Sequence, residues 1–468
     1  MPDVANRVMA VRQYVDDNIA TAMAHLIEDA PDFALNRINP LAFARANELG
    51  EQDSVAAFLH ATQLGLFELS WNVVCESCGG VLYQAESLQG IDQHHYNCAF
   101  CSLDCEPMLD ETVEITFTVA PRVRHIAAHD PDSLPLWDYT RQIFWSSGSD
   151  LPEHLAPVVS KAVIDAFEIA PGARMARQVQ LSEGVAILFD PVTHSSRFLE
   201  VAGDANDDQR LPIEIDDAHA AGETLRIAPG LLTLDLENRT NRRIMPILWI
   251  AGEALEAIVT RRVPVLTAKR LLTHQTFRDI YRTNVLDINQ RFKITNLTFL
   301  FTDLKGSTEL YERIGDLAAF DLVRSHFQLM HSVVAAHGGA VVKTIGDAVM
   351  ATFSRPVQGV AAALDMRKSI NELNRRDSRD DLFLKVGLHS GPCLAVLMNE
   401  RQDYFGQTVN IASRLQNIAT PDLIFATRTV VEDEEARALI AARGRGLHGT
   451  TALLRGLSGE IPVYGIPA

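Results

Sequence analysis

Basic residues are in short supply in this chain of 468 residues, in which 42 lysines and arginines face 60 aspartates and glutamates. The resulting net charge of −18 repels a polyanion, so we expect no nucleic-acid partner. A basic segment followed by an apolar one is missing after Met1, and we therefore expect no signal peptide. The apolar run over residues 245–251 is followed by Glu253 and Glu256, so no integral membrane segment is expected. These absences together predict a cytoplasmic protein.

Cysteine is almost absent outside one short region, because five of the six cysteines lie between residues 75 and 105. Four of these form two CxxC pairs: Cys75, Cys78, Cys98 and Cys101. Pairs at this spacing are typical of a zinc ribbon, and four thiolates leave no open position on the metal, so a structural Zn2+ is predicted. Cys105 is then a spare thiol, and His94 and His95 are substitute ligands. A redox or zinc-sensing switch is the alternative interpretation.

A first carboxylate, in surroundings typical of a phosphate-binding site, follows an apolar strand over residues 299–302. Asp303 ends this strand, and a short turn comes next: Gly306, Ser307 and Thr308. The free N–H groups of such a turn and of the helix that it starts favour a bound anion, and a polyphosphate fits them. An aspartate in this place is also typical of a helix cap, so the assignment of Asp303 as a metal ligand needs a second carboxylate.

The second carboxylate is Asp347, which sits with Gly346 between two apolar segments at residues 341–345 and 348–353. Two such segments joined by a tight Gly-Asp turn predict a β-hairpin with Asp347 at its tip. Carboxylates on loops at strand ends suit a pair of Mg2+ or Mn2+ ions, which take carboxylate oxygens and leave positions open for phosphate oxygens.

A third motif begins at Asp403 and leads through Gly406 into a helix that carries Asn410 and Arg414. Residues four apart share one face of a helix, so these two side chains are expected to lie together. Their neighbours are apolar, which predicts a largely buried helix, and a buried arginine needs an anionic partner.

From about Thr298 to the C-terminus, these motifs in this order resemble the catalytic domain of class III nucleotide cyclases, the adenylate and guanylate cyclase family. The resemblance implies that Asp303 and Asp347 bind two Mg2+ or Mn2+ ions in each active site. It also implies that Asn410 orients the ribose and that Arg414 stabilises charge on the α-phosphate. In this family the active sites form between two catalytic domains, so a homodimer is expected.

Base choice can be argued from hydrogen bonding. Lys343 only donates and suits N1 of adenine, whereas an ionised Asp403 only accepts and suits the N6 amino group. Guanine would present the opposite pattern, and the family resemblance agrees, so the predicted substrate is ATP. An exposed hairpin lysine and a turn-forming aspartate are the alternatives. Arg455 is either a triphosphate ligand or a surface arginine.

The chain is predicted to contain a helical, winged-helix-like unit with the zinc ribbon at 1–112 and a β-rich, sandwich-like regulatory domain at 113–264. A helical linker at 265–292 and a ferredoxin-like α/β (α+β) catalytic domain at 293–468 follow. A long helix is expected at 152–167, and another at 266–281 that either transmits a signal or simply connects. One catalytic-domain helix is expected to bury a single stripe: Phe320, Val323, Phe327, Met330 and Val334.

The N-terminal half as a whole resembles the uncharacterised domains that precede cyclase domains in some bacterial proteins. The resemblance implies regulation by a ligand or protein that the sequence does not identify. The predicted function is therefore an adenylate cyclase regulated by its N-terminal half. A guanylate cyclase and a catalytically silent nucleotide-binding scaffold are the alternatives, although both aspartates and the Asn410–Arg414 pair are retained.

Overall fold

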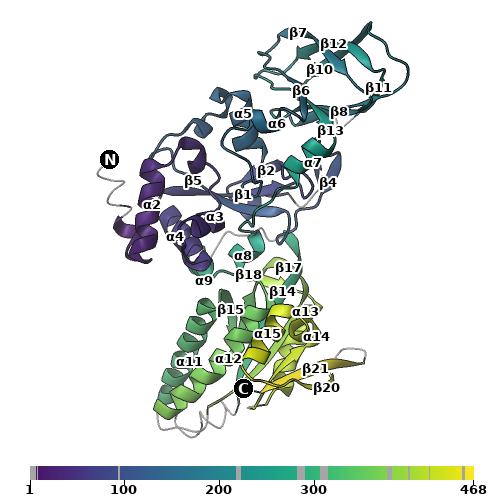
Figure 1. The fold of residues 1–468 in the computed structure, drawn as a ribbon. Coiled ribbons are helices and arrows are strands. Elements are labelled where there is room, and N and C mark those ends of the chain that lie inside the picture. Colours follow the sequence, from purple (N-terminus) through teal and green to yellow (C-terminus); the bar gives the residue numbers. More distant parts are fainter. Residues whose placement is uncertain are drawn as a thin grey trace. The chain divides into compact units, whose positions relative to one another are not determined.

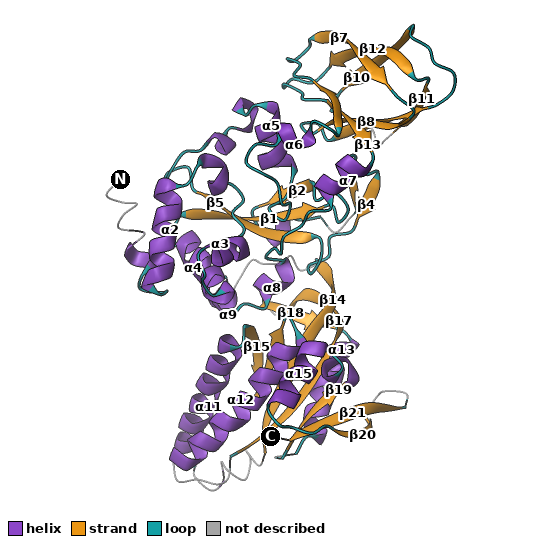
Figure 2. Cartoon of the chain, viewed as in Figure 1, coloured by secondary structure: helices purple, strands orange, loops and turns teal. Residues whose placement is uncertain are grey.

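The computed structural model describes most of the chain: residues 7, 9–92, 95–217, 223–281, 290–305, 312, 315–376, 382–398, 401–420, 422–455 and 459–467. It divides into two units. The N-terminal unit comprises Met1–Pro107 and Glu111–Leu266, and the C-terminal unit comprises Met108–Asp110 and Thr267–Ala468. Figure 1 shows the elements in chain order, and Figure 2 separates helices from strands. The finer division into four parts stays a prediction.

Three helices begin the N-terminal unit: α2 (Asp17–Asp29), α3 (Pro40–Ala46) and α4 (Glu51–Gln63). The Asn39 side chain caps α3 by accepting from the backbone N–H groups of Leu41 and Ala42. An antiparallel sheet of order β2-β1-β5 follows, built from β1 (Phe67–Val74), β2 (Val81–Ala85) and β5 (Val113–Val119). The small hairpin of β3 (Tyr96–Cys98) and β4 (Leu103–Cys105) carries three of the cysteines at its ends and turn.

The β-rich part of the N-terminal unit consists of two sheets of order β10-β12-β7 and β11-β9-β8-β13-β6. Their strands are β6 (Val163–Ala166), β7 (Arg174–Leu181), β8 (Gly184–Asp190), β9 (Ser195–Val201), β10 (Gln209–Ile215), β11 (Glu223–Ile227), β12 (Gly230–Asn238) and β13 (Ile247–Ala251). Side chains from both sheets share one core, among them Leu188 and Leu232. Strand β12 alternates strictly between buried and half-buried residues, as expected for one face on a core. The sandwich-like, β-rich character of this half is confirmed.

The helix predicted over residues 152–167 is wrong. Only α6 (Ala156–Val159) is helical, and Val163 already belongs to β6, which pairs with β13. Pro157 in the first turn favours a helix start, but the β-branched pair Val163–Ile164 gains more from the sheet edge than from a longer helix. The remaining short helices of this region are η3 (Ala127–His129), η4 (Pro131–Ser133), α5 (Leu136–Tyr139), the π-helical turn η5 (Thr140–Phe144) and α7 (Glu253–Val259).

The single helix predicted over residues 266–281 is present instead as two short helices, α8 (Ala268–Leu272) and α9 (Gln275–Ile280). The Thr267 side chain accepts from the Arg270 N–H and begins α8. The Thr273 hydroxyl donates back to the carbonyl oxygens of Lys269 and Arg270, and this local bonding ends α8 before α9 starts.

The sheet of the C-terminal unit has the order β15-β16-β14-β17-β19-β21-β20, with β18 paired to β17. Its strands are β14 (Arg291–Lys305), β15 (Gly339–Ile345), β16 (Ala348–Phe353), β17 (Phe383–Met398), β18 (Arg401–Phe405), β19 (Leu423–Thr427), β20 (His448–Leu453) and β21 (Glu460–Pro467). Its helices are α11 (Asp316–Ala336), α12 (Pro356–Arg376), α13 (Gln407–Ile418), α14 (Arg428–Val431) and α15 (Glu434–Ala442). Helices α11 and α12 lie side by side (Figures 1 and 2) and share a core with the central strands. The predicted α+β fold is confirmed.

The buried stripe of α11 is the predicted one only in its second half. Met330 and Val334 are buried and Phe327 packs partly buried against the core, as predicted. Phe320, however, is 66% exposed and Val323 is only half-buried, and in the first half Ala319, Leu322 and His326 are buried instead. His326 lies in the middle of this stripe and interrupts its apolar pattern in the sequence. Its side chain is nevertheless completely buried.

Candidate functional site

Asp303 lies near the end of β14, the strand that pairs with both β16 and β17. The residue before it, Thr302, is paired with Val349 of β16, and Asp303 itself lies opposite Lys385 of β17. Its side chain is half-buried. The sheet therefore holds one carboxylate at a fixed register beside the β15–β16 hairpin.

Asp347 occupies the turn between β15 and β16, where the hairpin was predicted. Burial raises the pKa of Asp303, and the negative charge of Asp347 raises it further, while Lys385 and Gln416 oppose the shift. The two carboxylates are thus close enough to repel each other. The Oδ2 atom of Asp347 is buried and has no hydrogen-bond partner among the described residues.

These observations fit a divalent cation. An unpartnered, buried carboxylate oxygen beside a second carboxylate is the donor set that Mg2+ and Mn2+ accept. Asp303 and Asp347 would hold the metal. The predicted phosphate turn of Gly306, Ser307 and Thr308 lies outside the described residues.

Sequence reasoning missed His326, which α11 places against the Asp347 turn. The residue is completely buried, and burial lowers its pKa to about 4, although the Asp347 carboxylate and backbone oppose this. The imidazole is therefore neutral at physiological pH, and neither of its ring nitrogens has a hydrogen-bond partner among the described residues. The four-residue spacing of Leu322, His326 and Met330 is the signal that could have revealed it.

Lys343 of β15 and Asp403 of β18 are brought together as an ion pair. The Asp403 side chain is 9% exposed and that of Lys343 is 39% exposed. The second carboxylate oxygen of Asp403 accepts from the Tyr404 backbone N–H at 2.8 Å. Asp403 is therefore anchored, whereas the Lys343 amine reaches it from the more open side. A donor and an acceptor thus lie next to each other although 60 residues separate them.

Asn410 and Arg414 share one face of α13, as predicted, but this face is not buried. Asn410 is exposed and Arg414 is half-buried, while Thr408, Ala412 and Leu415 face the core. Among the described residues, neither side chain forms a hydrogen bond or an ion pair with a neighbour. The described part of the chain therefore does not supply the anionic partner that was expected for Arg414. Helix α13 is amphipathic, with these two side chains on its polar face.

The position of α13 depends on Gly387 in β17. A Cβ atom there would lie 2.3 Å from the backbone nitrogen of Gln416 and 2.8 Å from the carbonyl oxygen of Ala412. Only glycine permits so close an approach of a helix backbone to a strand. The polar face of α13 is thereby fixed at one distance from the sheet that carries Asp303.

Two side chains of α9 hold the strands next to the Lys343–Asp403 pair. Arg278 donates to the carbonyl oxygen of Gln402 at 2.9 Å and to that of Val342 at 3.4 Å. Gln275 accepts from the Val341 N–H at 2.8 Å. Since Val342 and Gln402 directly precede Lys343 and Asp403, Arg278 sets the spacing of the strands that present this pair.

Arg455 is exposed in the turn after β20, and residues 456–458 beyond it lie outside the described part. Leu454, directly before it, packs in one cluster with Leu415 of α13, and the role of Arg455 as a triphosphate ligand stays a prediction.

The cysteines of the two CxxC pairs gather in the N-terminal unit, with their four sulfur atoms within 4.8 Å of one another. The Sγ atoms of Cys78 and Cys98 are 3.6 Å apart. A tetrahedral zinc site with Zn–S bonds of about 2.3 Å places its sulfurs about 3.8 Å apart, so the cluster fits Zn2+. Cys105 is also buried and lies beside Cys75, and His94 falls outside the described residues.

Arg262 braces this cluster. It donates to the carbonyl oxygen of Ser77, between the first two cysteines, at 3.0 Å. Gly79 has a positive φ of 72°, and a Cβ atom there would lie 1.7 Å from the Arg262 guanidinium. A glycine is thus required after the first pair both for the turn and for the approach of the arginine.

Residues 1–279 match a family described as "Family of unknown function (DUF5939)", and residues 290–445 match the adenylate and guanylate cyclase catalytic domain. Retinal guanylyl cyclase 1 of Mus musculus is 26% identical over 188 residues, which cover 36% of this chain and 17% of that protein. Guanylate cyclase soluble subunit beta-2 of Homo sapiens is 28% identical over 34% of this chain and 29% of that protein. The matches therefore span only a minor part of these relatives.

Among solved structures, the adenylyl cyclase CyaB from P. aeruginosa is similar over 38% of this chain and 95% of that chain, at 23% identity and a TM-score of 0.34. The guanylyl cyclase Cya2 is similar over 38% of this chain and 91% of that chain, at 21% identity and a TM-score of 0.32. None of the helices in the described ranges combines the length and the hydropathy that a bilayer crossing needs.

Proposed function

Because this chain belongs to the family of unknown function DUF5939 and carries an adenylate and guanylate cyclase catalytic domain, we propose that it is an adenylate cyclase that converts ATP to 3′,5′-cyclic AMP and pyrophosphate. The proposal includes a homodimer, a regulatory N-terminal half and a cytoplasmic location. The observation that carries the choice of base is the Lys343–Asp403 ion pair.

An adenine ring that enters between these side chains satisfies both. The Lys343 amine donates to N1, and the Asp403 carboxylate, which is already held by the Tyr404 N–H, accepts from the N6 amino group. Guanine would leave a donor facing a donor and an acceptor facing an acceptor in a half-buried place, which costs affinity and turnover.

The reaction joins the ribose O3′ to the α-phosphorus, releases the 3′-hydroxyl proton and breaks the bond from the α-phosphorus to pyrophosphate. Asp303 and Asp347 would hold divalent cations, which when bound would acidify the 3′-hydroxyl and neutralise charge on the triphosphate. Asn410 hydrogen-bonds the ribose and keeps O3′ in line with the leaving group. Arg414 donates to the α-phosphate oxygens as negative charge grows on them in the transition state.

Sharing of each active site between two chains is supported by the open face of α13. Asn410 and Arg414 lack partners among the described residues, and Asp347 has an unpartnered oxygen. A two-fold pairing in which each α13 faces the aspartates of the other chain would place Asn410 and Arg414 beside the nucleotide and the cations that those aspartates would hold. The cysteine cluster is assigned a structural Zn2+, because four thiolates fill its coordination.

A guanylate cyclase is the second candidate, and the observation in its favour is that the two curated relatives described above are guanylate cyclases by name. The two candidates differ in the purine base of their substrate, so a measurement of nucleotide specificity separates them. The test compares kcat/KM for ATP and for GTP in the wild type and in Lys343→Glu/Asp403→Cys. We expect the wild type to favour ATP and the double variant to lose that preference by about 10²-fold, since two polar contacts of about 1.4 kcal/mol each are removed.

Lys385→Gln is not a suitable control, because Lys385 lies opposite Asp303. The matched control is Lys368→Glu, an exposed lysine on α12 whose charge change leaves the base site alone. A wild type that favours GTP, or a preference that survives the double variant, would contradict the proposal.

A further inference from the structure

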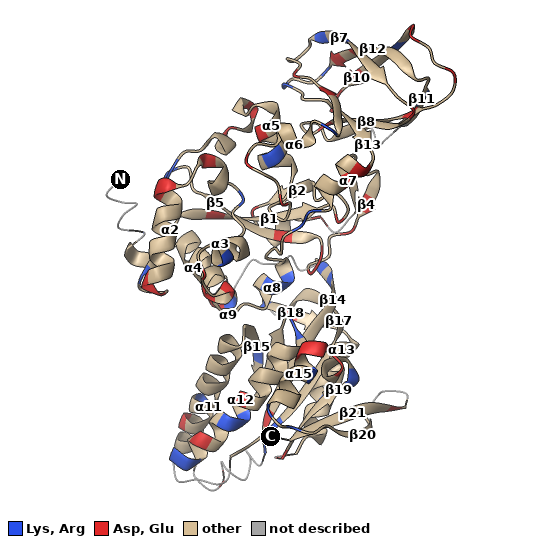
Figure 3. Ribbon diagram, viewed as in Figure 1, with Lys and Arg blue, Asp and Glu red and all other residues tan. Residues whose placement is uncertain are grey.

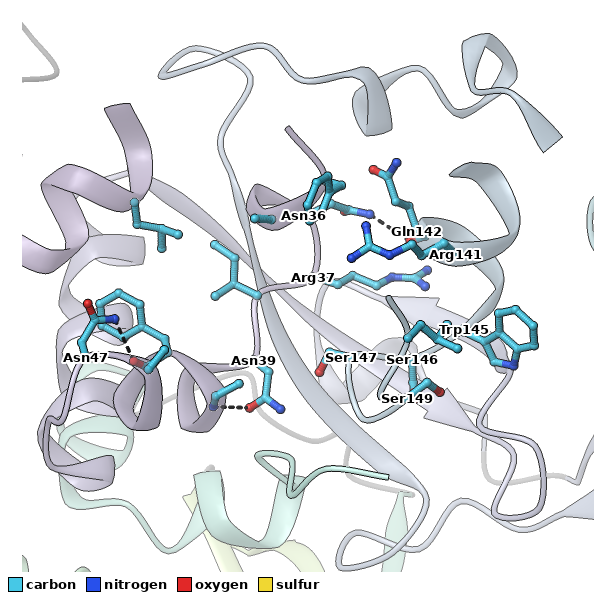
Figure 4. Close-up of a pocket in the computed structure, with 18 residues that line it drawn as sticks. Asn36, Arg37, Asn39, Asn47, Arg141, Gln142, Trp145, Ser146, Ser147 and Ser149 are labelled. Atoms are coloured by element: carbon cyan, nitrogen blue, oxygen red, sulfur yellow. Dashed lines mark hydrogen bonds between the residues drawn. The ribbon is translucent and has the colours of Figure 1, made fainter. Parts of the chain in front are cut away.

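The N-terminal unit contains a cavity of about 430 Å3 that the proposed cyclase chemistry does not use. Its walls come from two stretches of chain about a hundred residues apart, residues 26–47 and residues 141–151 (Figure 4). This volume is in the range of small-molecule sites. The N-terminal half is the part for which a regulatory ligand is expected.

The lining residues combine cations with flat apolar surfaces. Arg37 and Arg141 contribute the positive charge, and Phe33 and Phe43 contribute aromatic surface. No aspartate or glutamate is among the described lining residues, although acidic residues outnumber basic ones in the chain and occur throughout both units (Figure 3). The charged side chains of the lining are therefore all cations, and the carboxylates that act on them, Glu114, Asp138 and Glu153, lie outside the lining.

Arg37 is a costly residue to place here. It is 9% exposed, and its φ of 47° is in the left-handed region, which few residues other than glycine adopt. Its guanidinium donates to the carbonyl oxygen of Ile143 at 2.6 Å and to the side-chain oxygen of Gln84 at 2.8 Å, both neutral acceptors. The carboxylate of Glu114 acts on it only through space and itself accepts from Ser147.

Arg141 is half-buried, and its guanidinium carbon lies 4.1 Å from the centre of the Phe33 ring. Neither arginine forms an ion pair with a carboxylate in the described part of the chain. The Oε1 atom of Gln142, also in the lining, is buried without a hydrogen-bond partner. Two desolvated cations therefore face one cavity, and an anion would compensate their charge, whereas the Gln142 oxygen is an acceptor and would need a donor group.

One wall is hydrogen-bonded to the segment that leaves the N-terminal unit. The Asn39 side chain donates to the Pro264 carbonyl oxygen at 2.9 Å, and the Val263 N–H donates to the Gly148 carbonyl oxygen at 2.9 Å. Arg262 donates to the Ser149 hydroxyl at 2.7 Å and also reaches the cysteine cluster. Residues 262–264 thus contact the cavity wall immediately before the chain enters the C-terminal unit.

We propose that this cavity binds a small organic anion, a carboxylate or phosphate on a flat apolar body, and that its occupancy regulates the cyclase domain through residues 262–264. The regulatory step rests on the proposed cyclase activity, whereas the binding step does not. The anionic group contacts Arg37 and Arg141, and the apolar body lies against Phe33 and Phe43.

The binding test uses saturation-transfer NMR on the full chain with two anionic probes, benzoate and phenyl phosphate. Neutral benzamide and cationic benzamidine serve as probe controls. We expect saturable signals from at least one anion and none from the controls, and the stronger anion tells a carboxylate from a phosphate ligand. Absence of binding by both anions, or equal binding of benzamide, would overturn the proposal.

Arg141→Gln removes one cation and Ala42→Phe fills the cavity without a charge change. Each should weaken anion binding about tenfold or more, because a charge-assisted hydrogen bond or the space for the ring is lost. Arg45→Gln, an exposed arginine on α3 outside the lining, is the matched control and should bind as the wild type does. Binding that survives both lining variants would place the probes elsewhere and refute the site.

The regulatory step is tested in the same samples by measuring turnover with and without the bound anion. We expect a change of about threefold or more in the wild type and none in Ala42→Phe. Saturable binding with unchanged turnover would refute the regulatory step and leave the binding site standing. A chain that binds the anion but forms no cyclic nucleotide under any condition would refute the proposed function instead.

Discussion

The cysteine cluster of the N-terminal unit and the aspartate pair of the C-terminal unit collect metal-binding side chains in opposite ways. The cysteines of the two pairs lie within 4.8 Å of one another, mostly buried, and pack among aromatic side chains such as Phe100 and Trp249. Asp303 and Asp347 are half-buried at a strand end and a hairpin turn, and one of their oxygens has no described partner.

This difference separates a metal site that stabilises the fold from a metal site that takes part in a reaction. Four thiolates fill the coordination of a zinc ion, so the free energy of zinc binding adds to the free energy of folding. An open pair of carboxylates leaves coordination positions for substrate oxygens and keeps uncompensated charge in the folded protein. Loss of the first set should therefore affect stability, and loss of the second should affect turnover.

The largest expected effect is on folding. In Cys75→Ser/Cys98→Ser, zinc measured by elemental analysis should fall from stoichiometric to none, because two of the four ligands are gone. Binding of a structural zinc contributes about 10 kcal/mol or more to the free energy of folding, so the N-terminal unit should lose its cooperative melting transition. Cys393→Ser, which removes the buried thiol of the C-terminal unit, should keep its zinc. Full zinc and an unchanged melting temperature in the double variant would contradict the closed-site assignment.

Asp303→Asn should leave the fold intact and lower turnover by about 10³-fold, since metal binding supplies several kcal/mol of transition-state stabilisation. The raised pKa of Asp303 means that its ionised form costs folding free energy above that pKa. In metal-free protein at pH 7.5, the neutral asparagine should therefore melt higher than the wild type, and the difference should vanish in acid.

Addition of Mn2+ should raise the melting temperature of the wild type and leave that of Asp303→Asn unchanged. Asp321→Asn, an exposed aspartate on α11, is the matched control and should behave as the wild type. Equal stabilisation of both proteins by Mn2+ would show that Asp303 is not a metal ligand.

Arg414→Ala should lower kcat by about 10²–10³-fold without changing the melting temperature, because its proposed contact forms only with the transition state of a bound nucleotide. Arg437→Ala on α15 is the matched control. Mixed with Asp303→Asn, the inactive Arg414→Ala protein should regain up to about a quarter of the wild-type activity, since half of the random dimers carry one intact site of two. Demonstrated subunit exchange without recovery would refute the shared site.

The smallest effect is expected from Arg278→Gln, which removes the two carbonyl contacts beside the Lys343–Asp403 pair. The lost hydrogen bonds should cost about 0.5–1.5 kcal/mol of nucleotide-binding free energy. This predicts a three- to tenfold rise in KM for ATP with a smaller change in kcat. Arg324→Gln, an exposed arginine on α11, is the matched control. A lower kcat with an unchanged KM would mean that Arg278 does not position the base site.

The sequence predicted those features that short patterns encode. The Asp347 hairpin and the helical spacing of Asn410 and Arg414 depend on a few neighbouring residues, and the structure has both. The Lys343–Asp403 contact was predictable only because base recognition requires a donor and an acceptor together, although the residues come from different strands.

Features decided by tertiary contacts were missed. Val163 and Ile164 joined a sheet edge that no local pattern reveals, and a helix was wrongly expected there. His326 was hidden because a buried polar residue breaks the apolar stripe of α11. The cavity around Arg37 and Arg141 is built from two distant stretches of chain, so no motif announces it.

The most direct measurement is chromatographic product analysis after the purified full chain has been incubated separately with ATP and with GTP, each with Mg2+ and with Mn2+. Asp347→Ala serves as the blank. We expect cyclic AMP from ATP in the wild type, little cyclic GMP from GTP, and neither product in the blank. Cyclic GMP as the main product would contradict the assignment of Lys343 and Asp403, and the absence of any product would contradict the proposed cyclase.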